Sequence, residues 1–354
     1  MNKKTMLPLT VALSLTLCPM MFVDARDMTS PLPPASTSIV SPSPALTAKP
    51  EERQELTRAK EEIEKKHYSK AIELLKPLAD KDGLRGAQYH LGLMYMNGEG
   101  TKKDSRKAAE YFQKASDQGG QHATFNLALM NAQGDGVTQD FKKAFELFKK
   151  LADAGEADAQ FNVGLLYLFG QGVKQDGKLA EKYMAMAADQ GQVDAQYNQS
   201  LIFLDGKSDA EKHKAFKTLE KLAKKGYTAA EFNLGTMYLQ GEVVPKDTAL
   251  AAEWIQKAAE GGCLEAQYNL ALMYRNGAGV PRNDQQSVVW LKKAADYGYP
   301  DAQYNMGLLY ENGTNVPKNE KLAKQWFKMA ADQGDKEAKH KLSTFNGGRK
   351  TAAK

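Results

Sequence analysis

Cysteine is nearly absent from this chain. Only Cys18 and Cys263 occur in 354 residues, and Cys18 lies in an N-terminal segment that we expect to be removed. The one thiol that remains cannot form an intramolecular disulfide. Neither a Cys-x-x-Cys nor a His-x-x-x-His spacing occurs, so the sequence gives no support for a disulfide framework or a zinc site.

Catalytic motifs are missing as well. The five histidines are scattered along the chain, and no Gly-x-Ser-x-Gly elbow occurs. Gly-x-Gly steps are present, but none is followed by Gly-Lys-Ser or Gly-Lys-Thr at the spacing that a phosphate-binding loop requires. We therefore predict no catalytic residues, no cofactor and no metal. An enzyme would require side chains from distant parts of the chain to converge in a groove.

The excess of positive charge is small. The sequence has 48 Lys and Arg against 43 Asp and Glu, which is too even a balance to predict nucleic-acid binding. One local run of lysines stands out: Lys207, Lys212, Lys214, Lys217, Lys221, Lys224 and Lys225. It is interpreted either as a solvated helix face or as a site for an anionic envelope polymer.

Long apolar runs are confined to the N-terminus. Lys3 and Lys4 precede the apolar segment 7–23, and small residues occupy the −3 and −1 positions before a cut after Ala25. This pattern predicts a secretory signal peptide, residues 1–25, and a periplasmic or secreted protein with no stable membrane span after cleavage. An uncleaved anchor is the main alternative. A lipoprotein cut before Cys18 is disfavoured because Leu17 is too large for the preceding position.

The next two segments differ sharply in composition. Residues 26–50 contain fourteen Pro, Ser or Thr and no aromatic residue, so we expect a disordered linker. Residues 51–86 read as a charged helix followed by an amphipathic one, which predicts a degenerate N-terminal repeat that caps the fold.

A block of about 36 residues then recurs seven times over residues 87–337. The blocks begin at Ala87, Ala123, Ala159, Ala195, Ala230, Ala266 and Ala302. Each block predicts two helices. In the first helix the residue at position six is small, and the residue at position twelve, just past the helix, is always glycine. The second helix carries a pair of large apolar residues such as Trp290-Leu291. Such self-similarity is typical of proteins whose repeats bury their apolar faces only against neighbouring repeats. We predict an all-α, right-handed solenoid of about sixteen helices, with seven full repeats, a partial cap at each end, and residues 338–354 as a partial repeat and basic tail.

The pattern A-x-x-x-L-G-x-x-Y-x-x-G-x-G-V, followed by D-x-x-x-A-x-x-W-x-x-K-A-A-x-x-G, resembles the Sel-one-like repeat family, a relative of the tetratricopeptide repeat. The segments 306–313 and 326–331 match it closely. The resemblance implies a scaffold that binds another protein or an extended peptide, in envelope assembly or host interaction. The alternative is a binder or regulator of cell-wall glycan or of wall-processing enzymes. The block beginning at Ala195 departs most from the pattern, with Gln199 at a core position.

The first helix of each block carries the candidate partner-binding site. Its third position is aromatic and its fourth is Asn in six of seven blocks. This column of amides is interpreted either as a grip on the backbone of an extended partner or as a tie between repeats. At position eleven the third block has Phe169, whereas the other blocks have Asn, Gln or Asp. We predict partner contact in the third and fourth blocks, at Phe161, Asn162, Leu165, Phe169, Tyr197, Asn198, Leu201 and Leu204.

Overall fold

The computed structural model describes residues 49–205 and 208–347, and every regular element in these residues is a helix. The helices are α1 (Pro50–Glu64), α2 (Tyr68–Asp80), α3 (Arg85–Asn97), α4 (Ser105–Asp117), α5 (Gln121–Gln133), α6 (Phe141–Asp153), α7 (Ala157–Phe169), α8 (Gly177–Asp189), α9 (Val193–Asp205), α10 (Asp209–Lys224), α11 (Thr228–Gln240), α12 (Thr248–Glu260), α13 (Leu264–Asn276), α14 (Asp284–Asp296), α15 (Pro300–Asn312), α16 (Glu320–Asp332) and α17 (Lys336–Gly347). The predicted all-α repeat solenoid is thereby confirmed, with seventeen helices described where about sixteen were predicted.

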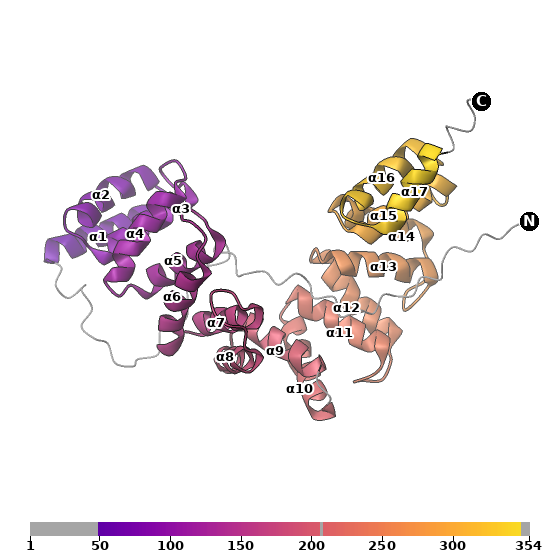
Figure 1. Cartoon of the computed structure of the whole chain (residues 1–354), viewed down its shortest axis with the longest axis horizontal. Coiled ribbons are helices and arrows are strands. Elements are labelled where there is room, and N and C mark those ends of the chain that lie inside the picture. The colour runs from indigo at the N-terminus through magenta and orange to yellow at the C-terminus, as the bar shows by residue number, and fades with distance from the viewer. Residues whose placement is uncertain (1–48, 206–207, 348–354) are drawn as a thin grey trace, which may run out of the picture. The chain divides into compact units, whose positions relative to one another are not determined.

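The chain divides into two compact units, and the boundary lies between Gln199 and Ser200 within α9. In each unit, consecutive helices pack as antiparallel hairpins (Figure 1). α1 begins one residue before the predicted cap. The predicted signal peptide and residues 26–48 of the predicted linker lie outside the described residues.

Each full repeat contains its own signals for starting and ending helices. In six of the seven repeats the second helix begins after an Asp or Asn whose side-chain oxygen accepts a backbone N–H of the first turn, as Asp104 accepts Lys107 N at 3.1 Å. In the repeat beginning at Ala195 the second helix begins after Ser208. Such a cap satisfies a donor that the helix itself leaves unpaired. In the six repeats where this glycine is described, the first helix ends at a glycine in the left-handed conformation, for example Gly98 with φ 74°, which a β-carbon would disfavour.

Small residues at the sixth position allow the two helices of a hairpin to approach closely, as predicted. A β-carbon built on Gly92 would lie 2.6 Å from Cε1 of Phe112, a side chain that is itself fully buried. The three tryptophans lie at the same position of their repeats but differ in burial. Trp290 is buried, whereas Trp254 and Trp326 are half-buried.

Buried glutamines join successive helices in a contact that we call the glutamine clasp. At position two of the block, the amide nitrogen of a glutamine donates to the last turn of the preceding repeat's second helix, as Gln303 donates to the Ala295 carbonyl at 3.2 Å. A second glutamine, thirty residues later, donates both to the first glutamine's Oε1 and to a glycine carbonyl. The clasp pairs are Gln88 with Gln118, Gln160 with Gln190, and Gln303 with Gln333, at 2.7–2.8 Å.

The clasp is incomplete at Gln267. Its amide nitrogen donates to the Ala259 carbonyl at 3.1 Å, but the residue thirty positions later is Tyr297, whose side chain is 76% exposed. Among the described residues, Gln267 Oε1 is one of two buried side-chain atoms with no hydrogen-bond partner. A buried acceptor without a partner costs on the order of 1–3 kcal/mol.

We predict that Tyr297→Gln stabilises the protein by about 1 kcal/mol, because the new amide would supply the missing donor to Gln267. Urea unfolding of the full chain measures the change. Tyr297→Ala is the matched control, since it removes the same exposed ring without adding a donor. Equal stability of the two variants would contradict the role assigned to the clasp.

Candidate partner-binding site

The predicted site begins on α7, most of which lies beneath the surface. Phe161 is 2% exposed, and Leu165 is also buried. Asn162 is buried too, and its amide nitrogen donates to the Asp158 carbonyl one turn earlier, at 2.8 Å. Phe169, the last residue of the helix, is 50% exposed. On α7, surface is therefore available to a partner chiefly at Phe169.

The predicted site continues on α9. Tyr197 and Asn198 are buried, and the Asn198 amide donates to the Asp194 carbonyl at 2.7 Å. Leu201 and Leu204 are half-buried, and they lie beyond the boundary between the two units. The structure thus places the first six predicted residues in one unit and the last two in the other. Partner contact at these eight positions stays a prediction.

The asparagine column joins repeats at two junctions. Asn305 Nδ2 donates to the hydroxyl oxygen of Tyr268, in the preceding repeat, at 3.1 Å and to the Asp301 carbonyl at 2.8 Å. Asn126 and Tyr89 form the equivalent pair, and there burial raises the Tyr89 pKa while the hydrogen bond partly offsets the rise. At these junctions the asparagine acts as a tie between repeats, one of the two interpretations that the sequence left open.

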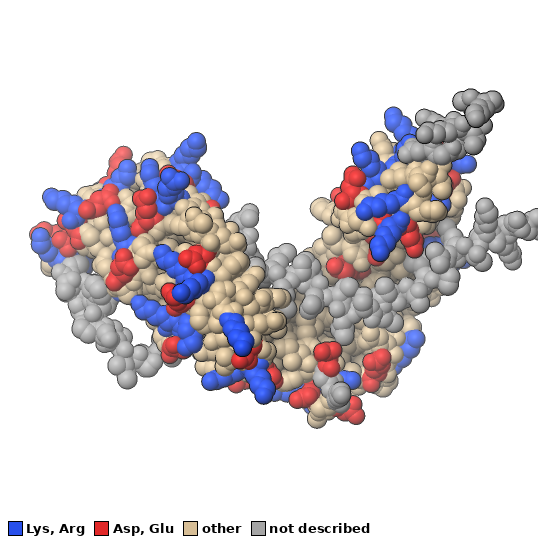
Figure 2. Space-filling view, viewed as in Figure 1, with Lys and Arg blue, Asp and Glu red and all other residues tan. Residues whose placement is uncertain are grey.

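The lysine run lies mainly on α10. Lys214, Lys217, Lys221 and Lys224 are exposed, and their spacing of three, four and three residues places them on one side of the helix. Lys214 Nζ lies 5.1 Å from the centroid of the Phe203 ring, and Lys224 pairs with Glu220 at 2.7 Å. Elsewhere the face seen in Figure 2 shows blue and red side chains interspersed over both units.

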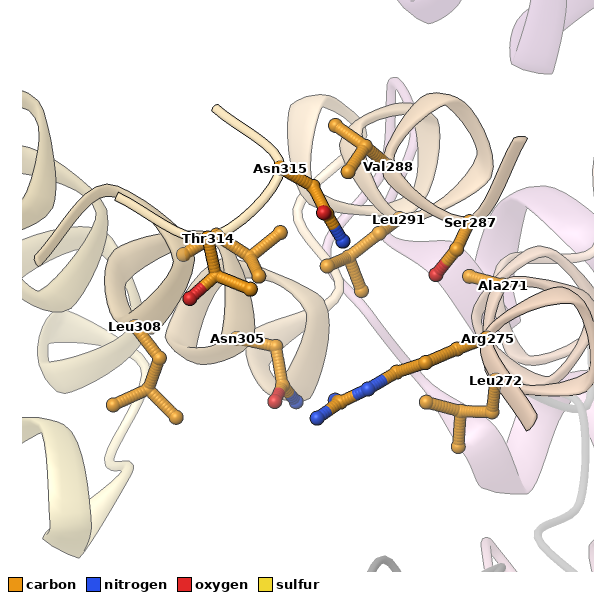
Figure 3. Close-up of a pocket in the computed structure, with 11 residues that line it drawn as sticks. Ala271, Leu272, Arg275, Ser287, Val288, Leu291, Asn305, Leu308, Thr314 and Asn315 are labelled. Carbon is orange, nitrogen blue, oxygen red and sulfur yellow. The ribbon is translucent and has the colours of Figure 1, made fainter. Parts of the chain in front are cut away.

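The C-terminal unit has a small hollow of about 30 Å³. It lies between α13, α14, α15 and the loop that follows α15 (Figure 3). The Arg275 side chain extends across it toward the Asn305 amide, and Leu308 lies on its far side. Ser287, Thr314 and Asn315 add polar atoms to the lining.

Charges around the hollow are partly paired. Arg282 binds Asp284 through two contacts of 3.1 Å. That hydrogen-bonded pair lowers the pKa of Asp284, and the charge of Arg275 and a hydrogen bond with Asn315 lower it further. Burial meanwhile raises the pKa of nearby Tyr268 to about 12. The charge of Arg275 therefore acts on groups of this protein, since it lowers the pKa of Asp284 and partly offsets the rise of the Tyr268 pKa.

The sequence analysis missed this hollow, although its signal was present in the repeat itself. Counting one block back from Arg275, Ser287, Thr314 and Asn315 gives Leu239, Ala251, Ala278 and Gly279. Position thirteen is polar in most other repeats, for example Glu99 and Gln171, so the polar departures from the repeat pattern that line the hollow are Arg275, Ser287 and Asn315. A search for departures from the repeat pattern that cluster in space would have found it.

Two further classes of site were sought in the described residues. No group of three or more His, Cys, Asp or Glu side chains that could hold a metal ion occurs in residues 49–205 and 208–347. Within the same part of the chain, no helix combines the length and hydropathy of a membrane span.

Comparison with protein families matched the description "Sel1 repeat" to six segments: 86–120, 121–156, 157–192, 228–263, 264–299 and 300–335. These segments make up more than half of the chain. The block beginning at Ala195 is not matched, although α9 and α10 form there. That is the block in which the sequence departs most from the pattern.

Two solved structures are similar. A Sel1 repeat protein from Oxalobacter formigenes is 27% identical with a TM-score of 0.64, and the alignment covers 90% of this chain and 99% of that one. A protective antigen of uropathogenic Escherichia coli strains, displaying an SLR fold, is also 27% identical with a TM-score of 0.66. There the alignment covers 85% of this chain and 65% of the antigen, just under two thirds of its length. Comparison with curated proteins found no match.

We predict that two phenylalanines of α7 differ in what they contribute to stability. Phe161→Ala should lower the free energy of unfolding by about 3–5 kcal/mol because it leaves a cavity in the core. Phe169→Ala should change it by less than about 0.5 kcal/mol because that ring is half in solvent. Urea unfolding of both variants measures this; a large loss for Phe169→Ala would make that ring part of the core.

Proposed function

The chain belongs to the Sel1 repeat family, and we propose that it is a non-catalytic scaffold that binds another protein or an extended peptide along the first helices of its repeats. The observation that carries this proposal is Phe169, a half-exposed aromatic ring at a position where the other repeats hold Asn, Gln or Asp. Large aromatic side chains with accessible surface are favoured anchors at protein interfaces.

The surroundings of Phe169 support a role as an anchor. Leu165 and Phe161 lie one and two turns before Phe169 on the same helix and are buried, so core packing fixes the position of α7. The left-handed Gly170 ends the helix directly after the ring, with φ 66°. A side chain presented by a fixed helix end loses little conformational freedom on binding, which favours affinity.

The scaffold is proposed to work outside the cytoplasm, in the periplasm or as a secreted protein. Residues 1–25 support export because they combine a basic start, an apolar segment and a small residue before the expected cut after Ala25. The similarity to a protective antigen is in keeping with this, since a protective antigen is met by the host's immune system. Envelope assembly and host interaction are the two settings in which such a scaffold would act.

A second candidate function is binding of cell-wall glycan or of an acidic envelope polymer, or regulation of the enzymes that process the wall. The lysines on one side of α10 favour it, because Lys217 and Lys221 are exposed and about a turn apart. Such a stripe attracts polyanions in a salt-dependent way. α10 lies in the block that the family comparison does not match.

We predict that a photo-reactive phenylalanine analogue placed at position 169 crosslinks to a protein partner in the native cell. The same analogue at Met329, an exposed position on α16, is the control and should not give that adduct. With the purified partner, Phe169→Ala should weaken binding by about thirtyfold, or about 2 kcal/mol.

If the protein instead binds cell-wall glycan, the lysines of α10 should matter for binding and Phe169 should not. Lys217→Ala with Lys221→Ala would then abolish sedimentation with purified peptidoglycan, while Phe169→Ala would leave it unchanged. If Phe169→Ala binds the crosslinked partner as tightly as the natural chain, the scaffold site lies elsewhere and the proposal for α7 fails.

We predict that the mature protein begins at Arg26 and is recovered from the periplasm or the medium. Cell fractionation followed by N-terminal sequencing tests this. Ala25→Arg should block cleavage, because a signal peptidase requires a small residue at that position. A chain that keeps Met1 and stays in the cytoplasmic fraction would contradict export.

A further inference from the structure

We propose that an exposed apolar patch on α14 and α16 binds a second copy of the chain, with the Tyr297 ring of each copy packed against Met329 of the other. The patch consists of Val289, Tyr297 and Met329, all of which are exposed. It lies on the second helices of the sixth and seventh repeats. The proposed scaffold site uses first helices of other repeats, so this inference goes beyond the scaffold function.

The members of the patch lie close together because the ends of α14 and α16 meet. Gln333, directly after α16, donates to the carbonyl oxygen of Gly298, the residue that follows Tyr297, at 2.9 Å. Met329 precedes Gln333 by four residues, which places both on one side of α16. Val289 lies about two turns before Tyr297 on α14. Tyr297 and Met329 are therefore neighbours, and Val289 extends the patch along α14.

The repeat architecture does not require these apolar side chains. When the repeats are aligned on the glycine that follows the second helix, five of the seven have Lys at the position of Met329. At the position of Val289, each of the other six repeats has a charged residue or Gln. Two adjacent repeats have thus replaced polar surface residues with exposed apolar ones at neighbouring positions.

Tyr297 also lowers the stability of its own chain. It occupies the position at which Gln118, Gln190 and Gln333 complete the clasp, and it leaves Gln267 Oε1 buried without a donor. The Tyr297 side chain is itself too exposed to add much to the core. A residue that breaks a packing rule of its own fold without a gain in stability is expected at a functional surface.

The charges beside the patch favour a second copy as its occupant. α14 carries Lys292 and, one turn later, Asp296, and α16 carries Lys328 and, one turn later, Asp332; all four are exposed. When α14 of one copy packs antiparallel to α16 of the other, the lysine of each helix lies opposite the aspartate of its neighbour. A two-fold axis repeats this match in both halves of the interface. The charge pattern is therefore self-complementary.

Two nearby groups do not oppose this arrangement. Lys292 pairs with Asp296 at 2.6 Å within α14, and an exposed pair of this kind can exchange partners at little cost. Lys293 lies between Val289 and Tyr297 in sequence, but its Nζ is 4.0 Å from the centroid of the Trp290 ring. Its charge is thus held against a ring of its own helix.

The side chains of the patch suit a weak, specific contact. Tyr combines a large apolar ring with a hydroxyl that stays hydrated or finds a partner, and the unbranched Met side chain adapts to the surface it meets. The charges set the orientation, while the apolar side chains supply most of the affinity. Three such side chains form the centre of an interface smaller than the usual one of about 800 Å² per partner, so we expect a Kd on the order of 10 µM.

Sedimentation equilibrium of the full chain measures the association. Over about 1 to 300 µM protein we expect a monomer–dimer equilibrium. A chain that remains monomeric throughout this range would overturn the proposal.

Two variants locate the interface. Tyr297→Gln and Met329→Lys, which install residues found at these positions in other repeats, should each weaken dimerisation about tenfold or more. Met186→Lys is the matched control, because Met186 is an exposed methionine at the same position of the third repeat; it should leave dimerisation unchanged. A dimer that survives both patch variants would overturn the assignment.

Unfolding separates loss of association from loss of folding. At about 1 µM, where a dimer of this affinity is dissociated, Tyr297→Gln should be at least as stable toward urea as the natural chain because it restores the clasp. A monomeric and equally stable variant therefore reports on the interface alone. If Tyr297→Gln is less stable, Met329→Lys decides the matter.

A crosslink tests the pairing of the two helices. The photo-reactive phenylalanine analogue at position 329 should give a covalent dimer of the chain, with the crosslink mapped by mass spectrometry to α14 of the second copy. Crosslinks confined to other helices would overturn the packing of Tyr297 against Met329. Phe169→Ala should leave dimerisation unchanged, so failure of this site and failure of the proposed scaffold site are distinguishable.

Discussion

Each helix pair of this protein can bury its apolar side only against the pairs before and after it. Gly92 facing Phe112 shows how little space separates the two helices of one repeat. The buried Gln303, which reaches back to Ala295, shows how one repeat is attached to the next. Stability is therefore a sum over neighbouring junctions, and a junction that lacks a partner for a buried oxygen, such as the one at Gln267, is weaker by a local amount. Binding sites are therefore expected at positions where packing between repeats does not determine the residue type.

Much of the fold could be predicted from the sequence because the same local pattern of glycine, small and aromatic residues recurs in seven blocks. A single glycine such as Gly98 says little, but glycine at the same place in seven blocks predicts seven helix ends. The pairing of aromatic and small residues likewise predicted which faces meet. The clasp was not predicted, because a glutamine is polar and its partner lies thirty residues away. Only the packing of successive repeats buries the first glutamine and brings the second within hydrogen-bond distance of it.

The candidate site was harder to predict because α7 is buried on most of its sides. Helical spacing assigns one face to the core and the opposite face to solvent. The residues of α7 from Ala159 to Leu166 are instead all buried, since this helix is covered on most of its sides by other helices. Spacing alone therefore could not tell which of Phe161, Asn162 and Leu165 has surface. Phe169 stood out because it broke the pattern, and the hollow at Arg275 is marked by the same kind of departure.

The placement of the helix signals has a consequence for how such an array can evolve. In six of the seven blocks, the Asp or Asn that starts the second helix and the glycine that ends the first helix lie within the same block as the helices they serve. Insertion or deletion of one whole block therefore brings its own start and stop signals and leaves the neighbouring blocks intact. Array length becomes adjustable without redesign of a core, so the extent of the surface that could contact a partner can change with the number of repeats.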